Sequence, residues 1–163
     1  MKIIFTGDFS ASGVFNNKIK NNDSIFDTQI TKLFLNSNYV HINLENPISE
    51  HNFREKNGIK LSAPVETSSF LKKNNINIAN LANNHIMDCG ERGLNDTIAH
   101  LSKNNILYYG IGGIKEYVIL QNNDLKVALI ASCHKEGPLW NGTTPAPLNY
   151  TIDSIKKLIT IIH

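Results

Sequence analysis

Polar side chains that could do acid–base or metal chemistry stand at the ends of several predicted strands. They are carboxylates, side-chain amides and imidazoles, drawn from three short segments and from the last position of the chain. The residues are Asp8, Asn43, Glu45, Asn84, His85, Asp88 and His163. Oxygen and nitrogen ligands brought together from several strands suit divalent metals such as Mn, Mg, Fe or Zn. Because ligands of open α/β sheets bind at the carboxyl ends of the strands, we predict a site at that edge.

The loop around His85 has two interpretations that spacing alone leaves open. In the first, Asn84, His85 and Asp88 are part of a ligand site, because an amide, an imidazole and a carboxylate crowd into one short loop. In the second they are a helix cap with solvated neighbours, since Asp88 and Glu91 have the D-x-x-E spacing of a capping box. Helical spacing follows at Leu94, Thr97, Ile98 and Leu101. We predict that Asp88 caps a helix beginning near Glu91 and does not bind metal directly.

The elements that must position these residues alternate between strands and helices. Strands are predicted at 2–7, at 39–44, around Ile76, Ile78 and Leu81, at 106–109, and at 158–162, just before His163. Helices are predicted after the caps Ser24 and Asp27, at 67–74, from about Glu91, and from Asp153. A hairpin is predicted at 117–121 and 125–132, around the turn cluster 122–124. Loops are expected at 9–22, at 48–63, and at 134–149, which contains Trp140. This alternation favours an α/β layered fold with a mixed sheet and flanking helices.

Length and composition are those of one soluble globular domain. The chain has 163 residues, 41% of them hydrophobic and 18% charged. A net charge of +2 without a Lys/Arg cluster argues against a nucleic-acid partner. No signal peptide or transmembrane span is visible, so we expect a cytoplasmic protein, with membrane-associated assembly left open. Cys89 and Cys133 lack metal-type spacing and are expected to be reduced thiols.

Several motifs, taken in chain order, resemble those of the capsule-synthesis CapA family, which is of the poly-γ-glutamate synthesis type. They are Gly7-Asp8, the segment 43–47 (Asn-Leu-Glu-Asn-Pro), and the segment 82–85 (Ala-Asn-Asn-His) with Asp88, Gly90 and Gly93. The turn 110–113 (Gly-Ile-Gly-Gly) and the hairpin after it also match. The fold of this family is similar to that of calcineurin-like metallophosphatases. The resemblance therefore implies a single metallophosphatase-like domain over residues 1–163.

The resemblance also implies a pair of divalent metal ions and their ligands. Asp8 would bind one ion, and Glu45 would lie between the two. Asn84 would bind the second ion through its side-chain oxygen. His163 looks like the first residue of the family's His-Trp-Gly segment and would be another ligand of the second ion.

The remaining site residues would act around these ions. His85 would not be a ligand but would hydrogen-bond or protonate the leaving oxygen, while Asn43 and Asp88 would support the ligands or bind substrate. Two cations can clamp the attacking and leaving oxygens of an in-line displacement, and an imidazole can supply general-acid help. The implied activity is metal-dependent hydrolysis of a phosphoester or related anionic bond. The implied partner is a small anionic or polymeric substrate of capsule synthesis.

The chain departs from the family pattern in two places. Ser10 stands where metallophosphatases often have a histidine, and the family's later histidine pair and Gly-Asn-Phe strand do not appear. We therefore expect an N-terminal portion, truncated at the C-terminus, that binds metal weakly and is weakly active or inactive by itself. Its open sheet edge would favour self-association. The alternative is a non-catalytic assembly or binding protein of capsular polymer synthesis that keeps a degenerate site.

Overall fold

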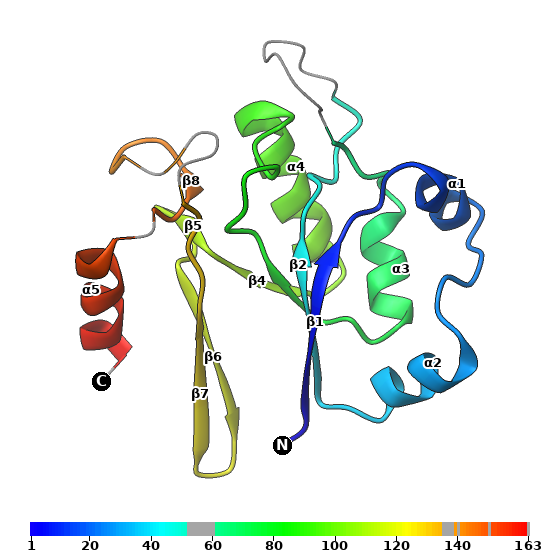
Figure 1. Ribbon diagram of the computed structural model, residues 1–163, viewed down its shortest axis with the longest axis horizontal. Coiled ribbons are helices and arrows are strands. Elements are labelled where there is room, and N and C mark those ends of the chain that lie inside the picture. Colours follow the sequence, from blue (N-terminus) through cyan, green and yellow to red (C-terminus); the bar gives the residue numbers. More distant parts are fainter. Residues whose placement is uncertain (52–60, 135–138, 140, 150, 163) are drawn as a thin grey trace.

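A parallel sheet of four strands forms the centre of the computed structural model, with strand order β1-β2-β3-β4 (Figure 1). The structure describes every residue except 52–60, 135–138, 140, 150 and 163. The strands are β1 (Ile3–Phe9), β2 (Tyr39–Leu44), β3 (Ile78–Asn80) and β4 (Leu107–Tyr109). The helices between them are α1 (Val14–Lys20), α2 (Thr28–Leu35), α3 (Thr67–Lys73) and α4 (Gly90–Lys103). Helical crossovers of this kind are how parallel strands are connected, and they bring all four carboxyl ends to one edge.

The chain after β4 forms smaller units. The hairpin consists of β6 (Tyr117–Asn122) and β7 (Leu125–Ile130), paired antiparallel. Two short strands, β5 (Ile111–Gly112) and β8 (Ala146–Pro147), pair antiparallel beside it, and α5 (Ile152–Ile162) follows. In Figure 1 the hairpin lies on one side of β1, and helices α1 to α3 lie on the other.

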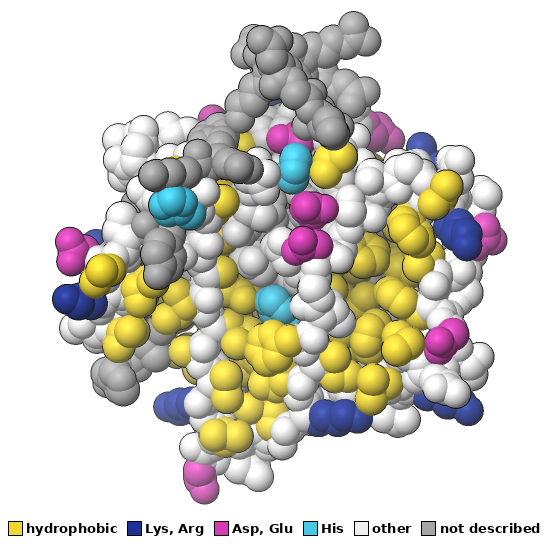
Figure 2. Space-filling view, viewed as in Figure 1, with side chains coloured by type: hydrophobic (Ala, Val, Ile, Leu, Met, Phe, Trp, Pro, Cys, Tyr) yellow, Lys and Arg dark blue, Asp and Glu magenta, His cyan; other side chains and the backbone are white. Residues whose placement is uncertain are grey.

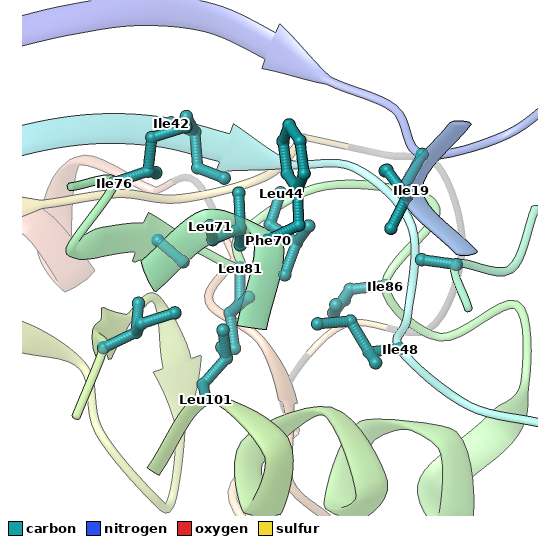
Figure 3. Close-up of a cluster of buried hydrophobic side chains, with 14 of the residues drawn as sticks. Ile19, Ile42, Leu44, Ile48, Phe70, Leu71, Ile76, Leu81, Ile86 and Leu101 are labelled. Carbon is teal, nitrogen blue, oxygen red and sulfur yellow. The ribbon is translucent and has the colours of Figure 1, made fainter. Parts of the chain in front are cut away.

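The main hydrophobic core lies between the sheet and its helices. Alternation along β2 turns Val40, Ile42 and Leu44 toward this core, where each is at most 1% exposed. Figure 3 shows Ile42 and Leu44 near Phe70 and Leu71 of α3 within this cluster. Burial of several large aliphatic side chains on one face is the dominant favourable term in folding of a layered domain.

The hairpin covers part of the opposite face of the sheet. Ile78 and Tyr109 from the sheet pack with Val118, Leu120 and Leu129 from the hairpin in a second, smaller cluster. Figure 2 shows hydrophobic side chains between β1 and the hairpin as well as between β1 and the helices. The covering is incomplete, because Phe5 on β1 remains 58% exposed.

Most predicted elements are confirmed. The α/β layered fold, the bounds of β2, the helix at 67–73 and the hairpin all appear where the sequence placed them. Asp27 caps α2 as expected, accepting a hydrogen bond from the Ile30 amide at 2.8 Å. The ends of the predicted excursion at 48–63 come together as a bridge between Ile48 and Ala63, while 52–60 fall outside the described residues. Trp140 also lies outside them.

Two predicted elements are wrong. The loop expected at 9–22 contains α1, because burial of Ile19 in the main core outweighs the low helix propensity of its neighbours. The strand expected at 158–162 is the second half of α5. Its β-branched run suggested a strand, but the apolar positions Ile152, Ile155 and Ile159 also fall at helical spacing. β1 is longer than expected, so Asp8 lies within the strand and not after it.

Two further expectations concern the cysteines and the helix lengths. Cys89 and Cys133 are both buried, and they form no disulfide bond with each other. Among the helices of the described residues, none has the length and apolar character needed to cross a bilayer.

Candidate functional site

Strand register brings polar side chains together at the carboxyl ends of β1, β2 and β3. A register shift between Phe5 and Asp8 aligns Asp8 with Asn43, and Asn43 is aligned in turn with Asn80. Asn43 Nδ2 donates a hydrogen bond to Asp8 Oδ1 at 2.8 Å, and Asn80 Nδ2 donates to Asn43 Oδ1 at 2.9 Å. Three neighbouring strands therefore contribute one bonded row of a carboxylate and two amides.

The loop after β3 is tied to this row by Asn83. Its Nδ2 donates to Asn43 Oδ1 at 3.2 Å and to the Leu44 carbonyl at 2.9 Å. Its Oδ1 accepts from the backbone N–H groups of His85 and Ile86 at 3.0 and 2.9 Å. This buried side chain thus fixes the turn that carries His85 against the end of β2.

His85 is paired with Asp88 inside the same loop. The two residues are three positions apart in the sequence, and the turn brings their side chains together. His85 Nδ1 lies 2.8 Å from Asp88 Oδ2. The same oxygen accepts from the Leu61 N–H at 2.9 Å. The side chains are 23% and 9% exposed. A carboxylate that holds one ring nitrogen fixes the orientation of the imidazole, as in acid–base catalysts.

The prediction that Asp88 caps α4 is wrong. The helix begins at Gly90, and its N-cap residue is Cys89, not Asp88. The Asp88 carboxylate is occupied by His85 and by the chain at Leu61 instead. The D-x-x-E spacing was therefore a coincidence of sequence, because the turn before the helix directs Asp88 toward His85.

The other predicted site residues lie close to these along the chain. Glu45 follows β2, is partly buried, and its N–H donates to the Phe9 carbonyl at 3.1 Å, which keeps it beside the end of β1. Asn84 is partly buried between Asn83 and His85, and His163 lies outside the described residues. Convergence of Asp8, Glu45, Asn84 and His85 in one cleft stays a prediction. Figure 2 shows acidic and histidine side chains gathered over the carboxyl ends of β1 and β2.

Within the described residues, no group of three or more His, Cys, Asp or Glu side chains could hold a metal ion. Carboxylate and amide oxygens have the right chemistry for hard divalent cations. Their number is insufficient in this part of the chain. A cavity of about 440 Å³ lies elsewhere, lined by other residues that include Lys20, Glu50 and Glu66.

Sequence reasoning missed the contributions of Asn80 and of Tyr109. Asn80 ends β3 at the level of Asn43, and Gly110 permits its close approach to β4, since a Cβ on Gly110 would lie 3.0 Å from Asn80 Oδ1. Tyr109 lies deeper in the sheet, where its hydroxyl is 2.8 Å from His41 Nε2. The signal available for Asn80 was a polar residue beside Leu81, at the end of the predicted third strand.

The His41–Tyr109 pair is buried beneath the polar row. His41 is only 8% exposed, which places it in the core and not at the rim of the sheet. Burial lowers the pKa of His41 and raises the pKa of Tyr109 to about 12, because a charged ring is poorly solvated there. Both groups are thus neutral at pH 7, which makes the pair a structural feature and not an acid–base couple at that pH.

Comparisons with known proteins agree with the motifs. A family model described as bacterial capsule synthesis protein PGA_cap matches residues 2–157. The PGA biosynthesis protein CapA of Bacillus subtilis (strain 168) is 37% identical over 95 residues, covering 57% of this chain and 25% of that protein. The capsule biosynthesis protein CapA of Bacillus anthracis is 30% identical over 135 residues, covering 77% of this chain and 33% of that protein. The matched regions thus span about a quarter to a third of the length of these relatives.

Proposed function

Because the chain belongs to the bacterial capsule synthesis family PGA_cap, we propose that it supplies part of a metal-dependent hydrolase site used in capsular polymer synthesis. The family has a metallophosphatase-like fold, and the parallel sheet with flanking helices is of that kind. The target would be a phosphoester or related anionic bond, in a pathway of the poly-γ-glutamate type. One observation carries the proposal: His85 is held by Asp88 in a loop that is hydrogen-bonded to the row ending at Asp8.

His85 is the proposed general acid. With Nδ1 bonded to Asp88, Nε2 is the ring nitrogen that would exchange a proton with a substrate oxygen. Positioned proton transfer of this kind contributes roughly 10²–10⁴-fold in rate. Asp88 sets the orientation of the ring and, through Leu61, anchors it to a neighbouring segment.

Asp8, Glu45 and Asn84 are the proposed metal ligands, with His163 as a further one. Their oxygens suit Mn²⁺ or Mg²⁺ better than a softer ion. A bound divalent ion would polarise the phosphoryl oxygen and activate a water molecule. Since the described residues include no group of three charged or thiol ligands, we expect metal binding by this chain alone to be weak.

A non-catalytic role in capsule assembly is the second candidate. Two observations favour it: the shortage of charged ligands among the described residues, and the bond from Asn43 that occupies one of the two oxygens of Asp8. In that case the polar row and the His85–Asp88 pair would serve as structure or as a binding surface for an anionic polymer.

Hydrolysis of bis-p-nitrophenyl phosphate with and without Mn²⁺ tests the proposal. We expect slow, Mn²⁺-dependent turnover that falls to background in His85→Ala, and falls less in Asp88→Ala, where only orientation is lost. His100→Ala, which removes a histidine from the last turn of α4, is the matched control. Calorimetric titration with Mn²⁺ should show weak binding in the unaltered chain.

Turnover that is equal in His85→Ala and the unaltered chain would contradict the proposed role of His85. A folded chain without turnover at any metal concentration would favour the assembly role. Tight binding of two Mn²⁺ equivalents would mean that ligands beyond those proposed complete the site.

A further inference from the structure

Side-chain amides form a continuous series of hydrogen bonds from the His85 loop to Asp8, which we call the amide relay. The His85 N–H donates to Asn83 Oδ1 at 3.0 Å, and Asn83 Nδ2 donates to Asn43 Oδ1 at 3.2 Å. Asn43 Nδ2 then donates to Asp8 Oδ1 at 2.8 Å. All donors in the relay point the same way, so each bond polarises the next toward the carboxylate.

A second branch meets the relay at the same atom. The Ala82 N–H donates to Asn80 Oδ1 at 2.8 Å, and Asn80 Nδ2 donates to Asn43 Oδ1 at 2.9 Å. Asn43 Oδ1 therefore accepts from two amides, and its Nδ2 serves the carboxylate. An amide is the side chain that offers both an acceptor and donors in one planar group.

The orientation of every amide in the relay follows from the backbone. A backbone N–H can only donate, so Oδ1 of Asn80 and of Asn83 must face Ala82 and His85. The NH₂ groups of both side chains must then face Asn43, whose oxygen has to turn toward them. A flipped Asn43 would place its NH₂ against two other NH₂ groups and its oxygen against a carboxylate.

We propose that Asn43 is the positioning residue of this edge, holding the Asp8 carboxylate and coupling it to the loop of His85. The effect of this positioning on catalysis rests on the proposed function, but the coupling between Asp8 and the His85 loop does not. Residue 8 must present a hydrogen-bond acceptor. Residue 43 must accept from Asn80 and Asn83 and donate to residue 8. The relay thus keeps the proposed ligand and the proposed acid in position, although Asp8 lies on β1 and His85 lies in the loop after β3.

Exchanging the two side chains isolates this role. Asn43→Asp puts two carboxylates face to face and removes the donor, so it is expected to destabilise the protein. Asp8→Asn is expected to be mild, since the new amide oxygen can still accept from Asn43. In the double variant, the amide introduced at position 8 can donate to the carboxylate introduced at position 43. The oxygens of that carboxylate can still accept from Asn80 and Asn83.

Thermal unfolding of the four proteins measures the coupling. Asn43→Asp loses a charge-assisted hydrogen bond, but solvent weakens this bond because Asp8 is exposed. For a chain of this size, Asn43→Asp should lower Tm by about 3–6 °C. Asp8→Asn should lower it by less than about 2 °C, and the double variant should recover at least half of the Asn43→Asp loss. Asn17→Asp, an exposed change on α1, is the matched control for added charge.

Additive losses in the double variant, or an Asn43→Asp loss no larger than that of Asn17→Asp, would overturn the proposal. If Asn43→Asp gives no folded protein, recovery of folded double variant supports the proposal, and its failure overturns it. The exchange also moves the carboxylate from β1 to β2. Recovered stability without turnover therefore supports Asn43 as the positioning residue, whatever the unaltered chain hydrolyses.

Amide hydrogen exchange tests the link to His85. In Asn43→Ala one of the two acceptors for Asn83 Nδ2 is lost, and only the Leu44 carbonyl remains. Exchange at the His85 N–H should therefore rise several-fold, while the Phe70 N–H in α3 keeps its protection. Equal protection of His85 in Asn43→Ala and the unaltered chain would show that residue 43 does not reach the loop.

Discussion

Strand β2 gives the two faces of the parallel sheet opposite kinds of residue, apolar on the helix side and polar on the hairpin side. On β2, Ile42 and Leu44 face the helices and are at most 1% exposed. His41 and Asn43, which alternate with them, face the other way and make hydrogen bonds with Tyr109 and Asp8. Period-two alternation along β2 therefore directs apolar packing to one face and hydrogen-bonding side chains to the other. The two can be perturbed separately by changing adjacent residues.

The polar face is itself divided along the strands. At the carboxyl ends lies the row that begins at Asp8, and below it lie Phe5, His41 and Tyr109. Phe5 and His41 have ring centroids 5.0 Å apart, yet Phe5 is largely exposed. The helix face thus has one continuous core, whereas the hairpin face changes from apolar to polar toward the candidate site.

The largest expected effect comes from the helix face. Ile42→Ala removes a fully buried side chain and should cost about 2–5 kcal/mol of unfolding free energy, measured by urea denaturation. Asn43→Ala, one residue away on the other face, should cost only about 1–2 kcal/mol through lost hydrogen bonds. A larger loss in Asn43→Ala than in Ile42→Ala would mean that the division of roles between the faces is wrong.

The sequence predicted the helix face better than the polar face. Alternation at 39–44 marked the buried side chains of β2, and Asp27 marked the start of α2, because both signals are local. The hairpin was likewise predictable from its turn, where Asn123 has a positive φ of 52°.

The contacts of the candidate site depend on register between distant strands, which one sequence does not reveal. Nothing local shows that Asn43 meets both Asp8 and Asn83, or that Asp88 turns to His85 and not to the helix N-terminus. Residue types near strand ends thus predicted polar side chains at this edge. Tertiary packing decides which of these side chains form hydrogen bonds with one another.

The buried His41–Tyr109 pair should give the next largest effect. Tyr109→Phe removes the hydroxyl and leaves His41 Nε2 without this partner, at a cost of about 1–3 kcal/mol. Among the described residues, His41 Nδ1 is already buried without a hydrogen-bond partner. Protonation of the ring would add a second N–H, which burial disfavours.

This pair also predicts a direction of pH dependence. The folded pKa of His41 lies below the ordinary value of 6.5, so the unfolded chain takes up the proton first as pH falls. Stability should be intact above about pH 6.5 and should decrease below it. Denaturation midpoints of the unaltered chain and of His41→Phe, compared between pH 7.5 and 5, measure this contribution. A His41→Phe midpoint that falls as steeply as that of the unaltered chain would assign the dependence to other groups.

The smallest expected effect is at Phe5, and it tests whether this side chain on the hairpin face is exposed to solvent. Full burial of a phenylalanine side chain contributes about 1.5–3 kcal/mol, and Phe5 is 58% exposed, so Phe5→Ser should cost less than about 1 kcal/mol. Phe34→Ser, at a site only 5% exposed on the helix face, should cost about 3–5 kcal/mol and serves as the matched control.

A Phe5 loss as large as the Phe34 loss would show that Phe5 is covered in solution. If that loss grows with protein concentration, and size-exclusion chromatography shows a larger species that Phe5→Ser abolishes, the cover is a second copy meeting the open edge at β1. If neither depends on concentration, the hairpin itself covers Phe5, and the contrast between the two faces is smaller than the exposed fractions indicate.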